Sequence, residues 1–177
     1  MRNILIIGGT KGIGKAIVDL LVNENNIVCM SRNSTEFSHN NYSHITFDST
    51  IDEFPDFEKV DTLIYCPGTI NLKPISTLSI EDFRKDFEIN VIGAVKAIKK
   101  YIPLLKKGFN PSILLFSTVA TKLGMPYHAS VSASKSAIDG IVKTLGAELA
   151  PKIRINAIAP TITKTELASK ILRNDKV

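Results

Sequence analysis

The residues best suited to chemistry form a glycine-rich turn near the start of the chain. The apolar run Ile4–Ile7 leads into residues 8–14, which contain four glycines, and a helical pattern follows at once. In such a unit Gly8 permits a tight turn, Gly12 lets the backbone approach a pyrophosphate, and Gly14 lets helix and strand pack closely. The helix N-terminus offers free N–H groups and a positive dipole end to phosphate. The predicted phosphate-binding residues are Gly8, Thr10, Lys11, Gly12, Ile13 and Gly14.

The end of the second predicted strand indicates which dinucleotide would bind. An acidic residue there would bond the ribose 2′-hydroxyl of NAD and repel a 2′-phosphate. Here Ser31 and Arg32 follow, and no carboxylate occurs before Glu36. The Arg32 guanidinium can bind a phosphate through two hydrogen bonds, and Lys11 is expected to project toward the same corner. These residues favour NADP(H) over NAD(H), although both cations could also be ordinary solvated surface charges.

Alternating strand and helix patterns must position this turn. Nearly continuous aliphatic runs predict six buried strands, at 3–8, 26–31, 43–48, 61–66, 112–118 and 153–159. Helical patterns cover 12–24, about 80–107 and about 129–149. This alternation predicts an α/β fold, a Rossmann-type doubly wound parallel sheet of about six strands. Residues 34–42 are polar and too few for a crossover helix, so a loop is expected there.

The length and composition are those of one folded domain. The chain has 177 residues, with 44% hydrophobic and 22% charged, which excludes disorder, collagen and coiled coil. We expect a single domain over 1–177, with a core at 2–167 and a polar tail at 168–177.

The charge and the cysteines constrain partners and compartment. The 22 basic residues exceed the 17 acidic ones but are scattered, so a local site for a small anion fits better than nucleic acid. The apolar run at the N-terminus is too short to span a membrane. Cys29 and Cys66 fall on predicted strands and lack CxxC spacing, so a reduced cytoplasmic protein is expected. His39 and His44 are read as surface residues, and no metal site is predicted.

These patterns resemble the short-chain dehydrogenase/reductase family over about residues 2–167. The turn at 8–14 matches the family's glycine motif, except that Ile7 stands at its usual threonine. Asp48, at the end of the third strand, matches the aspartate that holds the adenine amine in that family. After the fourth strand only Gly68 of the family's Asn-Asn-Ala-Gly motif is kept.

The second half of the chain carries further family positions. Asn90 matches the helix asparagine of the family's catalytic tetrad, which anchors a water there. The segment 156–160 matches another family motif and ends in Pro160, but Thr161 replaces the following glycine. Thr165 stands where the family's threonine contacts the nicotinamide carboxamide.

The catalytic positions depart from the family pattern. Lys135 matches the family's lysine, but Val131, four residues earlier, stands where the catalytic tyrosine is expected. Thirteen residues before that, Thr118 stands in the place of the family's serine, with Ser117 beside it. The missing phenol is the proton donor, whose loss typically costs about 10²–10⁴-fold in rate. Lys135 is still expected to reach the nicotinamide ribose, so cofactor binding should survive.

Two residues are considered as replacements for the missing acid. If the third helix begins at Pro126, Tyr127 shares the face of Val131 and could donate the proton. Tyr127 could instead be a loop residue that lines the substrate cleft. His128, seven residues before Lys135, is chemically plausible as an acid but could equally be a plain loop residue.

The resemblance implies an NADP(H)-dependent oxidoreductase that acts on a small carbonyl or alcohol by hydride transfer at a modified active site. The alternatives are a catalytically inactive NADP(H)-binding sensor or scaffold, or a truncated remnant. Family members usually continue into a lobe that covers the substrate. Residues 166–172 could begin that lobe, which would leave the substrate side open. The family's pairing of helices that match 80–107 and 129–149 implies a homodimer.

Overall fold

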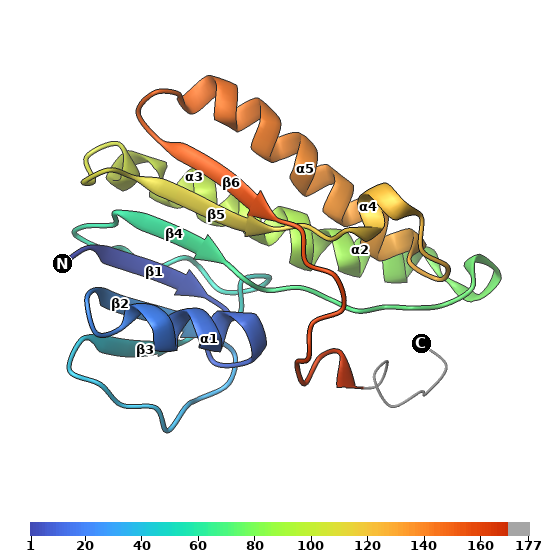
Figure 1. Cartoon of the computed structure of the whole chain (residues 1–177), viewed down its shortest axis with the longest axis horizontal. Helices are drawn as coiled ribbons and strands as arrows, with labels where there is room; N and C mark the ends of the chain where they lie inside the picture. Colours follow the sequence, from blue (N-terminus) through green and yellow to red (C-terminus); the bar gives the residue numbers. More distant parts are fainter. Residues whose placement is uncertain (170–177) are drawn as a thin grey trace.

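Six short runs of branched aliphatic residues form one parallel sheet in this computed structural model, which describes residues 1–169 (Figure 1). The strands are β1 (Asn3–Ile7), β2 (Asn26–Ser31), β3 (Tyr42–Thr46), β4 (Thr62–Tyr65), β5 (Ser112–Phe116) and β6 (Arg154–Ile158). Their order is β3-β2-β1-β4-β5-β6, and every neighbouring pair is parallel. This order is that of a Rossmann sheet, so the predicted fold is confirmed.

Helices cover both faces of the sheet because every central strand is apolar on both sides (Figure 1). The helix α1 (Gly12–Leu21) lies on one face. The other face carries α2 (Ile80–Phe87), a π-helical turn η2 (Glu88–Ile92), α3 (Gly93–Leu105) and α5 (Ala129–Leu149). Two short elements, η1 (Ile75–Thr77) and α4 (Ala120–Leu123), were not expected from the sequence.

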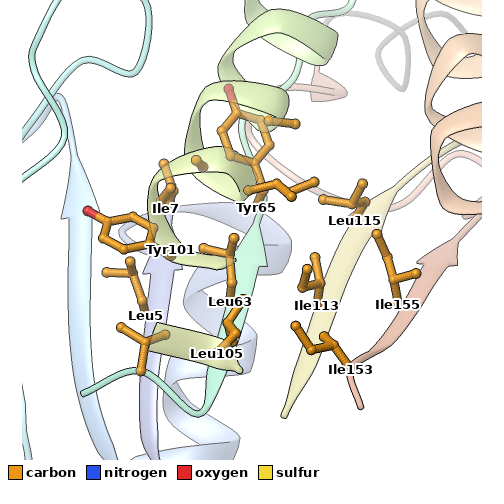
Figure 2. Close-up of a cluster of buried hydrophobic side chains, with 14 of the residues drawn as sticks. Leu5, Ile7, Leu63, Tyr65, Tyr101, Leu105, Ile113, Leu115, Ile153 and Ile155 are labelled. Atoms are coloured by element: carbon orange, nitrogen blue, oxygen red, sulfur yellow. The ribbon is translucent and has the colours of Figure 1, made fainter. Parts of the chain in front are cut away.

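Successive residues of a strand point alternately into two separate apolar clusters. Leu5, Leu63 and Ile113 point toward α3 and α5, where they pack with the fully buried Tyr101 (Figure 2). The neighbouring Ile6 points to the opposite face and packs with residues of α1. This alternation follows from the period of two in a strand, and it holds the ends of the strands rigidly in place.

The pattern read as one helix at 80–107 is divided in the structure. Ser79 begins α2 with a capping box, because its hydroxyl accepts from the backbone of Asp82 while the Asp82 carboxylate accepts from the backbone of Ser79. The π-helical turn then spans Glu88–Ile92, and α3 continues to Leu105. Single π turns of this kind are frequent at functional sites.

The order in which the chain adds strands to the sheet reverses between β1 and β4. This reversal indicates where the site lies. In an open parallel sheet, ligands bind outside the carboxyl ends of the strands at such a point. The connection from β2 to β3 contains no helix, as the polar segment 34–42 predicted. After β6 the chain crosses the carboxyl ends of the strands (Figure 1). Ala168 in this segment is buried, and the rest of the predicted polar tail, residues 170–177, lies outside the described part.

The helices of the described part, residues 1–169, include none with the length and apolar character needed to cross a lipid bilayer.

Candidate functional site

The turn between β1 and α1 has the geometry that a phosphate group requires. Gly8 and Gly12 have φ angles of +81° and +54°, a left-handed conformation that favours glycine. A Cβ atom on Gly14 would overlap the carbonyl oxygen of Gly8, so only glycine fits the first turn of α1. The N-cap residue Lys11 provides no side-chain cap, which leaves the N–H groups of this turn free for an anion.

A large cavity of about 1220 Å³ extends from this turn along the ends of β1, β2 and β3. Arg32 and Asp48 both line this cavity together with Ser31. Hydrogen bonds from Thr50, of 2.7 Å from its hydroxyl and 2.9 Å from its backbone, lower the pKa of Asp48, and the nearby Arg32 charge adds to this effect. The cavity therefore offers a cation beside an ionised carboxylate, at the positions where the sequence predicted contacts to the 2′-phosphate and the adenine.

Ser31 is held by a hydrogen-bond network that the sequence did not predict. Its hydroxyl oxygen lies 3.1 Å from the Thr10 hydroxyl and 2.8 Å from Nε2 of His44. The reading of His44 as a plain surface residue was therefore wrong, because this half-buried ring supports the cavity wall. His39 is also half-buried, and its Nδ1 accepts from the backbone of Asn41.

Lys11 and Arg32 both line the large cavity. The Lys11 ammonium lies 2.8 Å from a carboxylate oxygen of Glu166, in an exposed ion pair that the sequence did not predict. The methyl group of the adjacent Thr165 lies near Gly12. Residues 165–166, near the end of the described chain, therefore contact the phosphate turn. These contacts join segments that are 155 residues apart in the sequence.

Lys135 is the buried cation at the other end of the site. Its ammonium donates a hydrogen bond of 2.8 Å to the carbonyl oxygen of Phe116, at the end of β5. Burial lowers the pKa of Lys135 to about 8, although nearby negative charge partly opposes this shift. The side chain lines a cavity of about 180 Å³ that also contains Val131, Thr118 and Pro160. An amine of this pKa can exchange protons near neutral pH.

Asn90 lies in the π-helical turn and organises the space beside Lys135. Its side-chain amide donates to the Asp86 carbonyl at 2.8 Å, the Thr69 hydroxyl at 2.9 Å and the Ser134 hydroxyl at 3.3 Å. A Cβ atom on Gly68 would lie 3.3 Å from Oδ1 of Asn90 and 3.5 Å from Nζ of Lys135. The asparagine oxygen and the lysine ammonium thus both face the small space beside Gly68, where an added Cβ would fit tightly.

The position of the missing phenol is filled by an apolar wall. Val131 is buried in α5 and contributes its side chain to the cavity of Lys135. Thr118 lines the same cavity, where its hydroxyl accepts weakly from the backbone of Ala120 at 3.3 Å. Ser117 is buried, and its hydroxyl lies 3.5 Å from the backbone oxygen of Lys135. Thr118 is therefore the more accessible of the two hydroxyls.

Neither Tyr127 nor His128 stands on α5, which begins at Ala129. The condition under which Tyr127 would share the face of Val131 is thus not met. Tyr127 is 60% exposed, has a φ angle of +65°, and lines a separate cavity of about 570 Å³ with Lys73. His128 lines both cavities, and its Nδ1 lies 2.6 Å from the Pro126 carbonyl.

The remaining expectations concern cysteines and metals. Cys29 and Cys66 are both free thiols, as predicted. Within residues 1–169 no group of three or more acidic, histidine or cysteine side chains could hold a metal ion. The sequence missed Thr69 and Ser134 as partners of Asn90. Ser134 carried one available signal, because it lies directly before Lys135.

A comparison with protein families matches residues 44–177 to the family described as enoyl-(acyl carrier protein) reductase. Among curated proteins, cyclopentanol dehydrogenase from Comamonas is 27% identical over 191 residues, which cover 96% of this chain and 76% of that protein. The 3-oxoacyl-[acyl-carrier-protein] reductase of Buchnera aphidicola is 27% identical over 185 residues, covering 94% and 76%.

Solved structures show the same arrangement. Aldohexose dehydrogenase from Thermoplasma acidophilum, in ligand-free form, superposes with a TM-score of 0.87 at 25% identity, over 96% of this chain and 70% of that one. A short-chain dehydrogenase family protein from Francisella tularensis gives 0.86 at 27%, over 98% and 74%. ElxO with NADP bound gives 0.85 at 26%, over 99% and 79%.

Proposed function

The chain belongs to the short-chain dehydrogenase/reductase family, and from this premise we propose that it is an NADP(H)-dependent oxidoreductase of a small carbonyl or alcohol. The turn at 8–14 would hold the pyrophosphate, while Lys135 and Asn90 would act at the nicotinamide end. Family membership supports the reaction class, whereas the preference for NADP(H) and the substrate are proposals that rest on this chain's own residues.

Three observations support NADP(H) over NAD(H). The end of β2 carries Ser31 and Arg32 where a carboxylate would select NAD, and the Arg32 side chain is exposed to the large cavity. The hydroxyl of Ser31 is fixed by Thr10 and His44, so it could donate to or accept from a bound group without further ordering. In addition, the related ElxO is described with NADP bound.

The side chains around the small cavity supply what carbonyl reduction needs apart from the hydride. The bound nicotinamide would supply hydride to the carbonyl carbon. Thr118 can hydrogen-bond the carbonyl oxygen from the cavity wall. In place of the phenol, the Lys135 ammonium would donate the proton, since a pKa of about 8 leaves it mostly protonated yet acidic enough at neutral pH. Val131 would exclude water from this space as an apolar wall.

The observation that carries this proposal is the position of Lys135, a buried ammonium in a cavity beside the open end of the phosphate turn. The test is consumption of NADPH by the purified protein with a panel of small aldehydes and ketones, followed by absorbance. We expect substrate-dependent turnover with at least one member of the panel. Tight binding of NADPH without turnover on any member would contradict the enzymatic proposal.

Val131 favours a second candidate, an NADP(H)-binding sensor or scaffold without catalysis. A valine cannot donate a proton, so a site built around it could retain the ligand and lose the reaction. Calorimetry combined with the turnover assay separates the two candidates. The third reading, a truncated remnant, predicts no cooperative thermal unfolding, whereas both functional candidates predict a single sharp transition.

A homodimer and a cytoplasmic location remain predictions. Light scattering coupled to size exclusion should give twice the monomer mass. The free thiols Cys29 and Cys66 are consistent with a reducing compartment.

A further inference from the structure

Tyr65 is a buried tyrosine whose hydroxyl is not explained by the packing of the core. It ends β4 and is only 3% exposed, in the apolar cluster that packs against α3 (Figure 2). The ring alone would serve this packing, and phenylalanine would provide it without a polar atom to satisfy. Within residues 1–169, neither the large nor the small cavity is lined by Tyr65, so any effect on the site passes through a neighbour.

The hydrogen bonds of this hydroxyl lead to the π-helical turn that carries Asn90. The Tyr65 hydroxyl donates to the backbone carbonyl of Ile89 at 2.7 Å, and the Ser49 hydroxyl lies 3.0 Å away from it. A carbonyl can only accept and a phenol has one proton, so Ser49 must be the donor to Tyr65. Burial raises the pKa of Tyr65 well above its ordinary value, so the phenol keeps this proton at neutral pH.

Side chains supply two of the hydrogen bonds around this turn. A π turn bonds from residue i to i+5 and is rare, so it needs support from its surroundings. The Asn90 amide donates to the Asp86 carbonyl at 2.8 Å, one turn earlier. Tyr65 donates to the second residue of the turn, Ile89. The hydroxyl fits there because α3 begins with Gly93, where an added Cβ atom would overlap the Tyr65 oxygen.

We propose, as a refinement that rests on the proposed function, that Tyr65 is a positioning residue whose hydroxyl fixes the π-helical turn so that Asn90 faces Lys135. Ile89 is the residue directly before Asn90, so a shift of its carbonyl also moves the asparagine side chain. Oδ1 of Asn90 and the Lys135 ammonium share the small space beside Gly68. A displacement of the asparagine there alters its separation from the ammonium and the room left for a substrate.

The experiment compares two tyrosines of the same apolar cluster (Figure 2). Tyr101 of α3 is fully buried, and its hydroxyl donates to the Pro55 carbonyl at 2.9 Å, a contact that lines neither the large nor the small cavity of the described part. Tyr65→Phe and its matched control Tyr101→Phe therefore remove the same group from the same core. The Asn90 side-chain amide signal, assigned by its loss in Asn90→Ala, is followed by ¹⁵N NMR without substrate.

Tyr65→Phe should move the Asn90 amide signal, and hydrogen exchange of the turn's backbone amides should become about fivefold faster or more, as loss of a buried hydrogen bond allows. Tyr101→Phe should do neither, although both variants should lose similar stability. In the proposed reaction kcat should fall by about 10-fold in Tyr65→Phe, while KM for NADPH stays within about twofold. A merely structural hydroxyl would make the two variants behave alike, and that result would overturn the proposal.

A second variant keeps the test decisive if Tyr65→Phe does not fold. Ser49→Ala removes the donor to the Tyr65 hydroxyl and should move the Asn90 signal in the same direction by a smaller amount. An unchanged Asn90 signal in the folded variant overturns the proposal, and so does a failure of both variants to fold. The NMR measurements need no turnover, so an original protein that binds NADPH without catalysis would contradict the proposed function and leave the positioning of Asn90 still tested.

Discussion

The two ends of the site differ in how far they keep the features of a working enzyme. At the phosphate end, three glycines have the conformation or the close approach that a pyrophosphate site needs, and Arg32 stands beside an ionised Asp48. At the other end, Lys135 and Asn90 keep their places while Val131 replaces the group that would donate the proton. The first region keeps the geometry that the proposed binding requires, whereas the second lacks the phenol expected at position 131.

Under the proposed function, cofactor binding and proton transfer would depend on separate residues of one fold. The glycine turn works through backbone shape and the end of α1, which no side chain at the catalytic end can change. The catalytic end depends on a few ionisable or polar side chains. A single substitution there can remove one of the groups that the reaction needs. Variants at one end should therefore leave the properties of the other end intact.

The largest effect should come from removing the remaining acid. Lys135→Ala removes the one ammonium that residues 1–169 contribute to the small cavity, and turnover should fall by about 10²–10⁴-fold. Steady-state consumption of NADPH measures this loss, and calorimetry should show that binding falls far less. Lys122→Ala removes an exposed lysine of α4 as a control and should leave turnover unchanged. Equal losses of NADPH binding and turnover in Lys135→Ala would contradict the view that the two ends of the site act independently.

The second-largest effect should be an increase in turnover. Val131→Tyr restores a phenol one turn before Lys135, where the ammonium can lower its pKa, and should raise turnover by about 10- to 100-fold. The same assay checks this result, with Val131→Phe as the control that adds the ring without the hydroxyl. If both variants behave alike, the pocket itself rather than the missing acid limits the reaction.

At the phosphate end, Arg32→Asp should act on one cofactor only. Loss of a charge-assisted bond to the 2′-phosphate should weaken NADPH by about 10- to 100-fold and leave NADH nearly unchanged. Calorimetric affinities for both cofactors measure the difference. Arg154→Asp makes the same charge change at the far end of β6 and controls for the general field. Equal weakening of both cofactors would remove the basis for the proposed NADP(H) preference.

The smallest effect concerns the ion pair that the sequence did not predict. Glu166→Gln frees Lys11 from its exposed partner, and NADPH should bind about two- to threefold more tightly because Lys11 becomes available to phosphate. The gain should disappear at high salt, where exposed charges are screened. Tighter binding that persists at high salt would point to a rearranged turn instead.

The sequence could predict features that depend on local pattern. Continuous aliphatic runs gave all six strands to within about two residues, and the glycine spacing gave the turn, because both are set by neighbours along the chain. The valine at position 131 was also visible in the sequence, because the family resemblance places a tyrosine four residues before Lys135.

Other features depended on contacts between distant segments. Asp86 lies in a run of charged residues that reads as a solvated surface, yet packing against α5 buries it. The π-helical turn at Asn90 carries no signature in the pattern of apolar residues, which continues through it. Lys11 finds Glu166 only after the whole sheet has formed.

The most direct test of the account is a calorimetric titration of NADPH into the folded protein, beside two glycine variants. Gly12→Val places a side chain where the pyrophosphate would approach, whereas Gly124→Val introduces the same left-handed strain in open space, at φ +64°. We predict saturable binding to the original protein and to Gly124→Val, and a loss of about 100-fold or more in Gly12→Val. An absence of binding heat from cooperatively folded original protein would contradict the central claim that residues 8–14 hold a dinucleotide.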